Sequence, residues 1–165
     1  MSRYAIYESE RGDQWRYTLG IPGKKPLLAI GLNPSTATRE KADPTVARVQ
    51  RVAEINGYDG FVMLNLYPVR STKFEDLPTT ADARAYRKNL EAIERVVAGV
   101  RKPEIWAAWG QPVTKREYFS QARDELLERL APYRPKWLRF GSLTKTGHPR
   151  HPSRLDYGWT LEPYE

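Results

Sequence analysis

The chain of 165 residues contains no cysteine and only two histidines, His148 and His151. The absence of cysteine excludes disulfides, thiolate catalysis, iron–sulfur clusters and Cys-based zinc sites. Two histidines three residues apart, with few carboxylates near them, do not indicate a metal site. The Walker-type phosphate loop, the G-x-G-x-x-G fingerprint and the G-x-S-x-G elbow are also missing, which argues against ATP, dinucleotides and a serine nucleophile. The sequence therefore predicts a protein without metal or cofactor.

Long apolar runs are missing as well. The apolar runs, such as those at 27–30 and 105–109, cover only a handful of residues, so no segment is expected to cross a membrane. The first residues, MSRYAIYESERGD, carry no apolar leader region, which predicts a cytoplasmic protein. The length fits a single domain spanning residues 1–165, and we expect it to be a monomer.

The chain has an excess of positive charge, and this excess is local. Lysine and arginine number 27 against 20 aspartates and glutamates, a formal net charge of +7. The window from Arg129 to Leu155 holds seven basic residues and no acidic one, so the remainder of the chain is balanced. Both histidines lie in that window. Such a run is either a solvated surface or a loop that faces phosphate groups.

Apolar runs and turn residues predict an α/β architecture. Residues 1–20 read as a β-hairpin, with strands at 4–8 and 14–19. Buried strands are expected at 26–32, 61–66, 105–109 and 137–140, and helices from Asp43 to Asn56, from Thr80 or Asp82 to Val100, and from Pro112 to Leu130. Strands that alternate with helices indicate a three-layer sandwich, with a central, mostly parallel four-stranded sheet and helices on both faces.

The carboxyl ends of the predicted strands bring polar residues to one edge of the sheet. There Asn33 can hold a water by accepting and donating hydrogen bonds, Asn65 can bind a base edge, and His151 can donate to an oxygen that gains negative charge. Ordinary roles stay open, because Asn33 can form an Asx-turn and Asn65 can satisfy a buried backbone group. The full set expected at the edge is Asn33, Ser35, Thr36, Asp43, Asn65, Arg70, Gln111, Lys145, His148, His151 and Ser153.

Four short motifs at these strand ends resemble the uracil-DNA glycosylase superfamily. Residues 31–35 (GLNPS) are similar to its first motif and residues 151–153 (HPS) to its second. Residues 63–66 resemble the strand that carries the base-reading Asn, and 105–110 the strand ending in Trp-Gly. Their order agrees over residues 26–156, and Asn paired with His is most similar to the single-strand-selective monofunctional branch. The chain is closer still to an uncharacterised domain family with LNPSTA, DPT and PRHPS signatures.

The resemblance implies a glycosylase-like core and specific residue roles. Asn33 would position the water that attacks the anomeric carbon, and His151 would stabilise the departing base. The residues implied to bind the base are Asn65, Tyr67, Gly31, Ser35, Asp43 and Trp109. Those implied to contact the nucleic-acid backbone are Ser153, Arg154, Arg150, Lys145, His148 and Arg70.

Departures from the superfamily pattern make uracil a poor candidate for the target base. Ser35 stands where the family has Gly, Arg154 replaces the second Pro of the His-Pro-Ser-Pro motif, and Tyr67 would have to substitute for a stacking Phe. The resemblance thus implies a monofunctional DNA glycosylase acting on a damaged or modified base in single- or double-stranded DNA. Two alternatives stay open: a hydrolase or transferase acting on free nucleosides or nucleotides, and a non-catalytic module that binds nucleic acid or a modified base.

Overall fold

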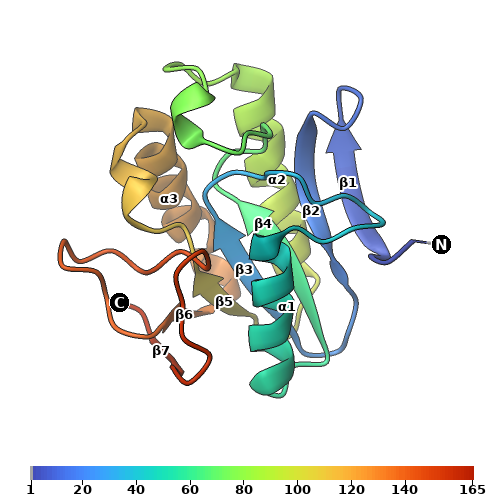
Figure 1. Ribbon diagram of the computed structural model, residues 1–165, viewed down its shortest axis with the longest axis vertical. Coiled ribbons are helices and arrows are strands. Elements are labelled where there is room, and N and C mark those ends of the chain that lie inside the picture. The colour runs from blue at the N-terminus through green and yellow to red at the C-terminus, as the bar shows by residue number, and fades with distance from the viewer. Residues whose placement is uncertain (1) are drawn as a thin grey trace.

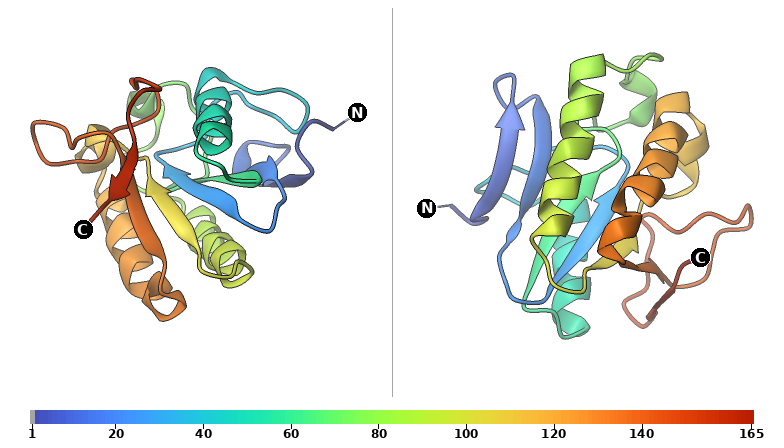
Figure 2. Two further views of the ribbon diagram at one scale, coloured as in Figure 1. Left: turned by 90° about the horizontal axis from the view of Figure 1, so that it is seen from below. Right: turned by 180° about the vertical axis from the view of Figure 1, so that it is seen from behind.

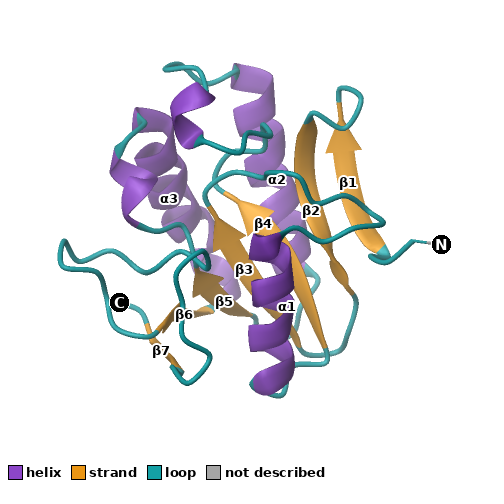
Figure 3. Cartoon of the chain, in the orientation of Figure 1, coloured by secondary structure: helices purple, strands orange, loops and turns teal. Residues whose placement is uncertain are grey.

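A computed structural model describes residues 2–165, which form one mixed sheet of seven strands covered by three α-helices (Figures 1 and 3). The strands are β1 (Ile6–Glu10), β2 (Trp15–Ile21), β3 (Pro26–Gly31), β4 (Gly60–Asn65), β5 (Glu104–Ala107), β6 (Lys136–Phe140) and β7 (Leu161–Pro163). Their order in the sheet is β1-β2-β4-β3-β5-β6-β7. The α/β class expected from the sequence is therefore confirmed.

The four central strands, β4, β3, β5 and β6, run parallel to one another. Leu28 of β3 is opposite Val62 of β4 on one side and Ile105 of β5 on the other. Every residue of β3 and β4 is buried, as the uninterrupted apolar runs predict for strands covered on both faces. Because the chain moves from β3 to β4 and then crosses back to β5, the strand order reverses beside β3. Ligands of such sheets bind outside the carboxyl ends of the strands at this reversal.

The helices cover opposite faces of the sheet. The helix α1 (Pro44–Ile55) lies on one face, and α2 (Ala83–Ala98) and α3 (Glu117–Leu130) lie on the other, as Figure 2 shows from below. Asp43 and Asp82 cap α1 and α2 through their side chains, and Pro44 occupies the first position of α1. Alternate residues of β3 enter different cores: Leu28 and Ile30 pack with α2 and α3, whereas Leu27 and Ala29 pack with α1.

The structure corrects the predicted extent of the sheet. The N-terminal hairpin is present, but β2 pairs with β4, so the hairpin extends the sheet instead of standing apart from it. The strand β7 was not predicted, because three residues that end in a proline give no clear strand pattern. It pairs antiparallel with β6. The expected four-stranded sheet is therefore the parallel centre of a sheet of seven strands.

Two element boundaries also differ from the sequence prediction. The strand β5 ends at Ala107 rather than residue 109. The helix expected from Pro112 is a 3₁₀ turn, Gln111–Thr114, and α3 begins only at Glu117 because Arg116 has an extended backbone. Within α3, Leu126 is buried whereas Leu127 is 37% exposed. Among the described residues, no helix is long and apolar enough to cross a membrane.

Candidate functional site

A cleft of about 870 Å³ opens at the carboxyl ends of the parallel strands. We call it the strand-end cleft. Its volume lies within the range of about 300–1,000 Å³ that is typical of small-molecule sites. Its walls come from the segments that follow β3, β4, β5 and β6, and from the first turn of α1. The lining residues are Leu32, Asn33, Ser35, Thr45, Ser71, Thr72, Phe74, Gln111, Pro112, Lys115, Thr144, Lys145, Arg150, His151, Ser153 and Arg154.

The charge on the walls of the strand-end cleft is of one sign. Lys115, Lys145, Arg150 and Arg154 line it, and none of the described lining residues is acidic. The guanidinium of Arg150 is fixed in place, because its Nε donates to the carbonyl of Ser142 (2.9 Å) and its Cζ lies 5.3 Å from the ring centroid of Trp159. A cleft lined by cations attracts anionic ligands and raises their local concentration.

His151 enters the cleft as a neutral imidazole with a defined tautomer. Its Nδ1 accepts a hydrogen bond from the backbone N–H of Ser153 (3.0 Å), so the ring proton must reside on Nε2. Burial lowers the pKa of His151 to about 4; the positive charge of Arg48 lowers it further, and Asp43 partly opposes this. At neutral pH the side chain therefore carries no charge and has one N–H to donate.

Gly110 makes room for His151 at the end of β5. Its φ is +77°, a conformation that favours glycine, and a Cβ at this position would lie only 2.8 Å from Cβ of His151. The two residues come from loops about 40 positions apart in the sequence. Their close approach fixes where the imidazole enters the cleft.

We expect Gly110→Ala to displace His151 and to raise its pKa from about 4 towards the ordinary value of about 6.5. Histidine NMR titration measures this shift. Gly57→Ala is the matched control, because Gly57 has a φ of +83° and a Cβ added there would meet nothing within 4 Å. Both variants should lose about 1–2 kcal/mol of stability from backbone strain. Equal His151 pKa values in the two variants would show that the close approach of Gly110 does not fix the position of His151.

Asn33 presents a hydrogen-bond acceptor to the cleft. Its Nδ2 donates to the carbonyl of Pro34 (3.1 Å) and to that of Ser71 (3.0 Å), which uses both amide hydrogens and fixes the orientation of the amide. Oδ1 is left to accept. The sequence predicts that Asn33 both accepts from and donates to a water, and the structure restricts it to accepting.

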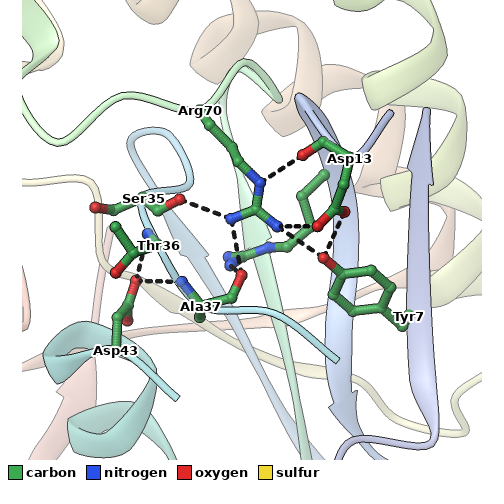
Figure 4. A network of polar contacts seen from close by, with 8 residues as sticks. Tyr7, Asp13, Ser35, Thr36, Ala37, Asp43 and Arg70 are labelled. Atoms are coloured by element: carbon green, nitrogen blue, oxygen red, sulfur yellow. Dashed lines mark hydrogen bonds and ion pairs between the residues drawn. The ribbon is translucent and has the colours of Figure 1, made fainter. Parts of the chain in front are cut away.

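The loop that carries Asn33 and Ser35 is held on both sides by charged groups (Figure 4). Asp43 accepts from the backbone N–H groups of Thr36 (3.2 Å) and Ala37 (3.1 Å) while it caps α1 through Val46 N–H (2.9 Å). Arg70 Nη1 donates to the carbonyls of Ser35 (2.6 Å) and Ala37 (2.7 Å). The backbone of the loop is thereby fixed through its N–H groups on one side and its carbonyls on the other.

Arg70 and Asp43 are thus engaged inside the protein rather than facing a ligand. The remaining nitrogens of Arg70 donate to the carbonyl of Asp13 (2.6 Å), to its carboxylate (3.1 Å) and to the hydroxyl of Tyr7 (2.7 Å). The resemblance implied that Arg70 contacts the nucleic-acid backbone and that Asp43 binds the base. In the structure neither lines the cleft, because their polar atoms are used to fix the loop.

Several other predicted residues also lie outside the lining of the cleft. Tyr67 is fully buried against Tyr118 and its hydroxyl accepts from Asp82 N–H (2.8 Å). Trp109 is buried and packs against Trp137 and Tyr164. Both side chains turn into the apolar core behind the strand ends. Gly31 and His148 are likewise absent from the walls.

Asn65, predicted to bind the base, is 1% exposed and does not line the cleft. Its Nδ2 has no hydrogen-bond partner among the described residues. Its backbone carbonyl accepts from Nδ2 of Asn89 (2.7 Å), whose own Oδ1 is also unpartnered within the described chain. Gly31 lies directly beside it: a Cβ there would be 2.9 Å from Oδ1 of Asn65. Buried polar groups normally have partners, so this amide retains an unused hydrogen-bonding capacity at the end of β4.

Sequence reasoning missed Phe74 and Lys115. Phe74 is half-buried and begins a 3₁₀ turn, Phe74–Asp76, within a segment that looks merely polar in the sequence. Arg116 holds this segment by donating to the carbonyls of Glu75 (3.2 Å) and Leu77 (3.1 Å). The backbone that carries this aromatic side chain is thus held by a residue about 40 positions later. No local signal marks such a contact.

The fold and the site together define a class of protein. It is an α/β protein with a basic cleft at the point where the strand order of its sheet reverses. Among the described residues, no group of three or more acidic or histidine side chains is placed to hold a metal ion. The chain belongs to the family "Protein of unknown function (DUF1643)", whose model matches residues 16–153. No curated protein and no solved structure shows significant similarity to it.

Proposed function

We propose that the protein is a DNA glycosylase-like enzyme that hydrolyses the N-glycosidic bond of a damaged or modified base, on a fold similar to that of the uracil-DNA glycosylases. One observation carries the proposal. Asn33 and His151 line the same cleft, whose described lining includes basic but no acidic residues. Asn33 has a free amide oxygen there, and His151 has a free Nε2–H. An acceptor for a water and a neutral donor for a leaving group are the two parts that this reaction needs.

In the proposed reaction, the bond between C1′ of the sugar and the base nitrogen breaks, and the electron pair leaves with the base. The sugar passes through an oxocarbenium-like state, and a water oxygen then bonds to C1′. Asn33 Oδ1 orients the water by accepting one of its hydrogens, and the proton released by the water passes to solvent or to the departing base. His151 Nε2–H donates to a base oxygen as it gains negative charge, which stabilises the transition state more than the ground state.

The base would lie against Phe74, which takes the stacking role that the sequence assigns to Tyr67. Phe74 is the one aromatic side chain among the described residues of the cleft. Stacking of a base on an aromatic ring contributes about 1–3 kcal/mol. Asn65, predicted to read the base edge, is assigned no contact with the base, because it is 1% exposed and lies outside the residues that line the cleft. Entry into such a site requires a flipped or single-stranded nucleotide.

The cations of the cleft would bind the phosphates beside the target nucleotide. Lys145, Arg150 and Arg154 retain their predicted role, together with Ser153, and Lys115 is added to them. Arg150 is the best positioned, since its contacts with Ser142 and Trp159 hold the guanidinium before a ligand arrives. A phosphate then binds without the entropy cost of ordering a long side chain.

The proposal is tested by a single-turnover assay on oligonucleotides that carry a panel of modified pyrimidines and purines, in single and double strands. We expect at least one substrate to yield an abasic product, and Asn33→Ala to slow its release by about 10- to 100-fold through loss of water positioning. Asn56→Ala, which removes the same side chain at the distant end of α1, should leave the rate unchanged. Folded protein that releases no base from any substrate would contradict the proposal.

A free nucleotide is the second candidate substrate, because a cleft of about 870 Å³ can enclose base, sugar and phosphate together. The salt dependence of binding distinguishes a nucleic-acid substrate from a free nucleotide. Binding of a nucleic acid weakens with a log–log slope of about 0.7–0.9 per phosphate contacted, whereas a nucleotide offers only its own phosphate group. A slope of several units for an oligonucleotide favours the nucleic acid.

A further inference from the structure

One face of α1 leads away from the strand-end cleft and is basic. Thr45 lines the cleft, and Arg48 and Arg51 follow at intervals of three residues, so the three share a face of the helix. The charge of Arg48 acts on His151 and helps to lower its pKa, which places this residue close to the cleft. The face therefore begins at the candidate site and continues along the helix.

The loop after β6 runs beside this face of α1 (Figure 1) and adds an aromatic ring to it. Cζ of Arg51 lies 5.3 Å from the ring centroid of Tyr157, a cation–π contact that fixes both side chains. Tyr157 is nevertheless 39% exposed, as one of four large hydrophobic side chains on the surface of the described chain. Arg154, three residues earlier in the same loop, is exposed and lines the cleft. We call Arg48, Arg51 and Tyr157 the α1 stripe.

The arginines of the α1 stripe have no carboxylate partner among the described residues, and the same holds for Arg154. On the opposite face of the sheet, by contrast, Lys88 and Arg95 of α2 pair with Glu10 and Glu8. The one acidic neighbour of Tyr157 in the loop, Asp156, accepts from the backbone N–H of Gly158 (2.7 Å). Unpaired guanidinium groups beside an exposed ring match a ligand that carries both phosphates and flat bases.

We propose that the α1 stripe binds single-stranded DNA that extends from the nucleotide held in the cleft. Arg48 and Arg51 contact successive phosphates, and an unpaired base stacks on the ring of Tyr157. The proposal rests on the proposed function, since it takes DNA as the substrate. It selects the single strand, because only unpaired bases offer a face to an exposed aromatic ring.

The test is the affinity of the full chain for a fluorescent oligothymidylate of about 15 nucleotides, measured by anisotropy over a range of salt concentrations. We expect Tyr157→Ala to weaken binding by about 5- to 100-fold and Tyr157→Phe to retain it, since stacking needs only the ring. Arg51→Ala should reduce the log–log salt slope by about 0.7. Arg101→Ala removes an exposed arginine before the amino end of β5, at the far end of the sheet, and is the matched control.

Affinities of Tyr157→Ala and Arg51→Ala equal to wild type would overturn the proposal, and so would equal effects of Arg51→Ala and Arg101→Ala. Preference for duplex over single strand would overturn it too. These outcomes differ from a failure of the proposed function. In that case the α1 stripe variants still lose affinity for the oligothymidylate, but the wild-type protein releases no base from any substrate.

Discussion

Replacing His151 with alanine is expected to lower the single-turnover rate of base release by about 100- to 1,000-fold. The variant removes the Nε2–H that is oriented towards developing charge, and loss of one such donor has an effect of this size. The rate is measured on the best substrate of the panel. His148→Ala is the matched control, because His148 belongs to the same loop but does not line the cleft. A rate within a few-fold of wild type for His151→Ala would remove His151 from the mechanism.

The pH dependence of the same rate tests the protonation state of His151. The folded pKa of about 4 lies below the ordinary value of about 6.5, so the side chain is neutral and active across neutral pH. We expect a flat profile down to about pH 5 and a fall towards pH 4, where protonated Nδ1 can no longer accept from Ser153 N–H. For the same reason, the stability that neutral His151 confers is complete above about pH 6.5 and declines towards pH 4. A rate that rises as pH falls below 6.5 would instead indicate a protonated, acidic His151.

Replacing Arg70 with methionine is expected to destabilise the protein by about 2–4 kcal/mol. The guanidinium is mostly buried, with 18% of its side chain exposed. Its loss leaves the carbonyl of Ser35 and Oδ2 of Asp13 without their donor, and leaves the carbonyl of Ala37 with only the longer hydrogen bond from Arg16 (3.3 Å). Urea unfolding measures the effect. Arg70→Lys should recover only part of it, because an ammonium group cannot reproduce the planar fork that reaches both sides.

The matched control for Arg70 is Arg95→Met. Arg95 also pairs with a carboxylate, that of Glu8, but its side chain is 61% exposed. Exposed pairs contribute about 0–1 kcal/mol, so this variant should stay close to wild type. Similar losses in the two variants would mean that the Asn33 loop does not depend on Arg70.

The sequence predicted the parts of the fold that depend on local signals. Asp43 followed by Pro44 marks the beginning of α1, and continuous apolar runs mark β3 and β4. Both signals involve only residues that are adjacent in the sequence. The pairing of the hairpin with β4 was not predicted, since it joins residues about 40 positions apart. The delayed beginning of α3 was missed because a proline that begins a 3₁₀ turn looks like one that begins an α-helix.

In the candidate site, too, the features that follow from strand order were predicted and those that depend on tertiary packing were not. Asn33 and His151 were placed in one cleft because the carboxyl ends of parallel strands must meet at one edge of the sheet. Tyr67 and Trp109 follow strands in the same way, yet both side chains turn into the core. The sequence does not specify on which side of a strand end such a side chain packs. Phe74 was missed because its segment is fixed by tertiary contacts, among them those of Arg116.

The strand-end cleft takes its walls from the ends of all four parallel strands, and its two key side chains are separated by more than a hundred residues. Its lining residues run from Leu32 to Arg154, so no short segment of the chain contains it. Contacts between residues so far apart in sequence carry a large loop-closure entropy and tend to form late in folding. During folding, intermediates with paired strands but an undocked loop after β6 would therefore lack His151 and most of the basic wall. Specific binding of an anionic ligand in the cleft is therefore expected only of chains in which this loop has docked.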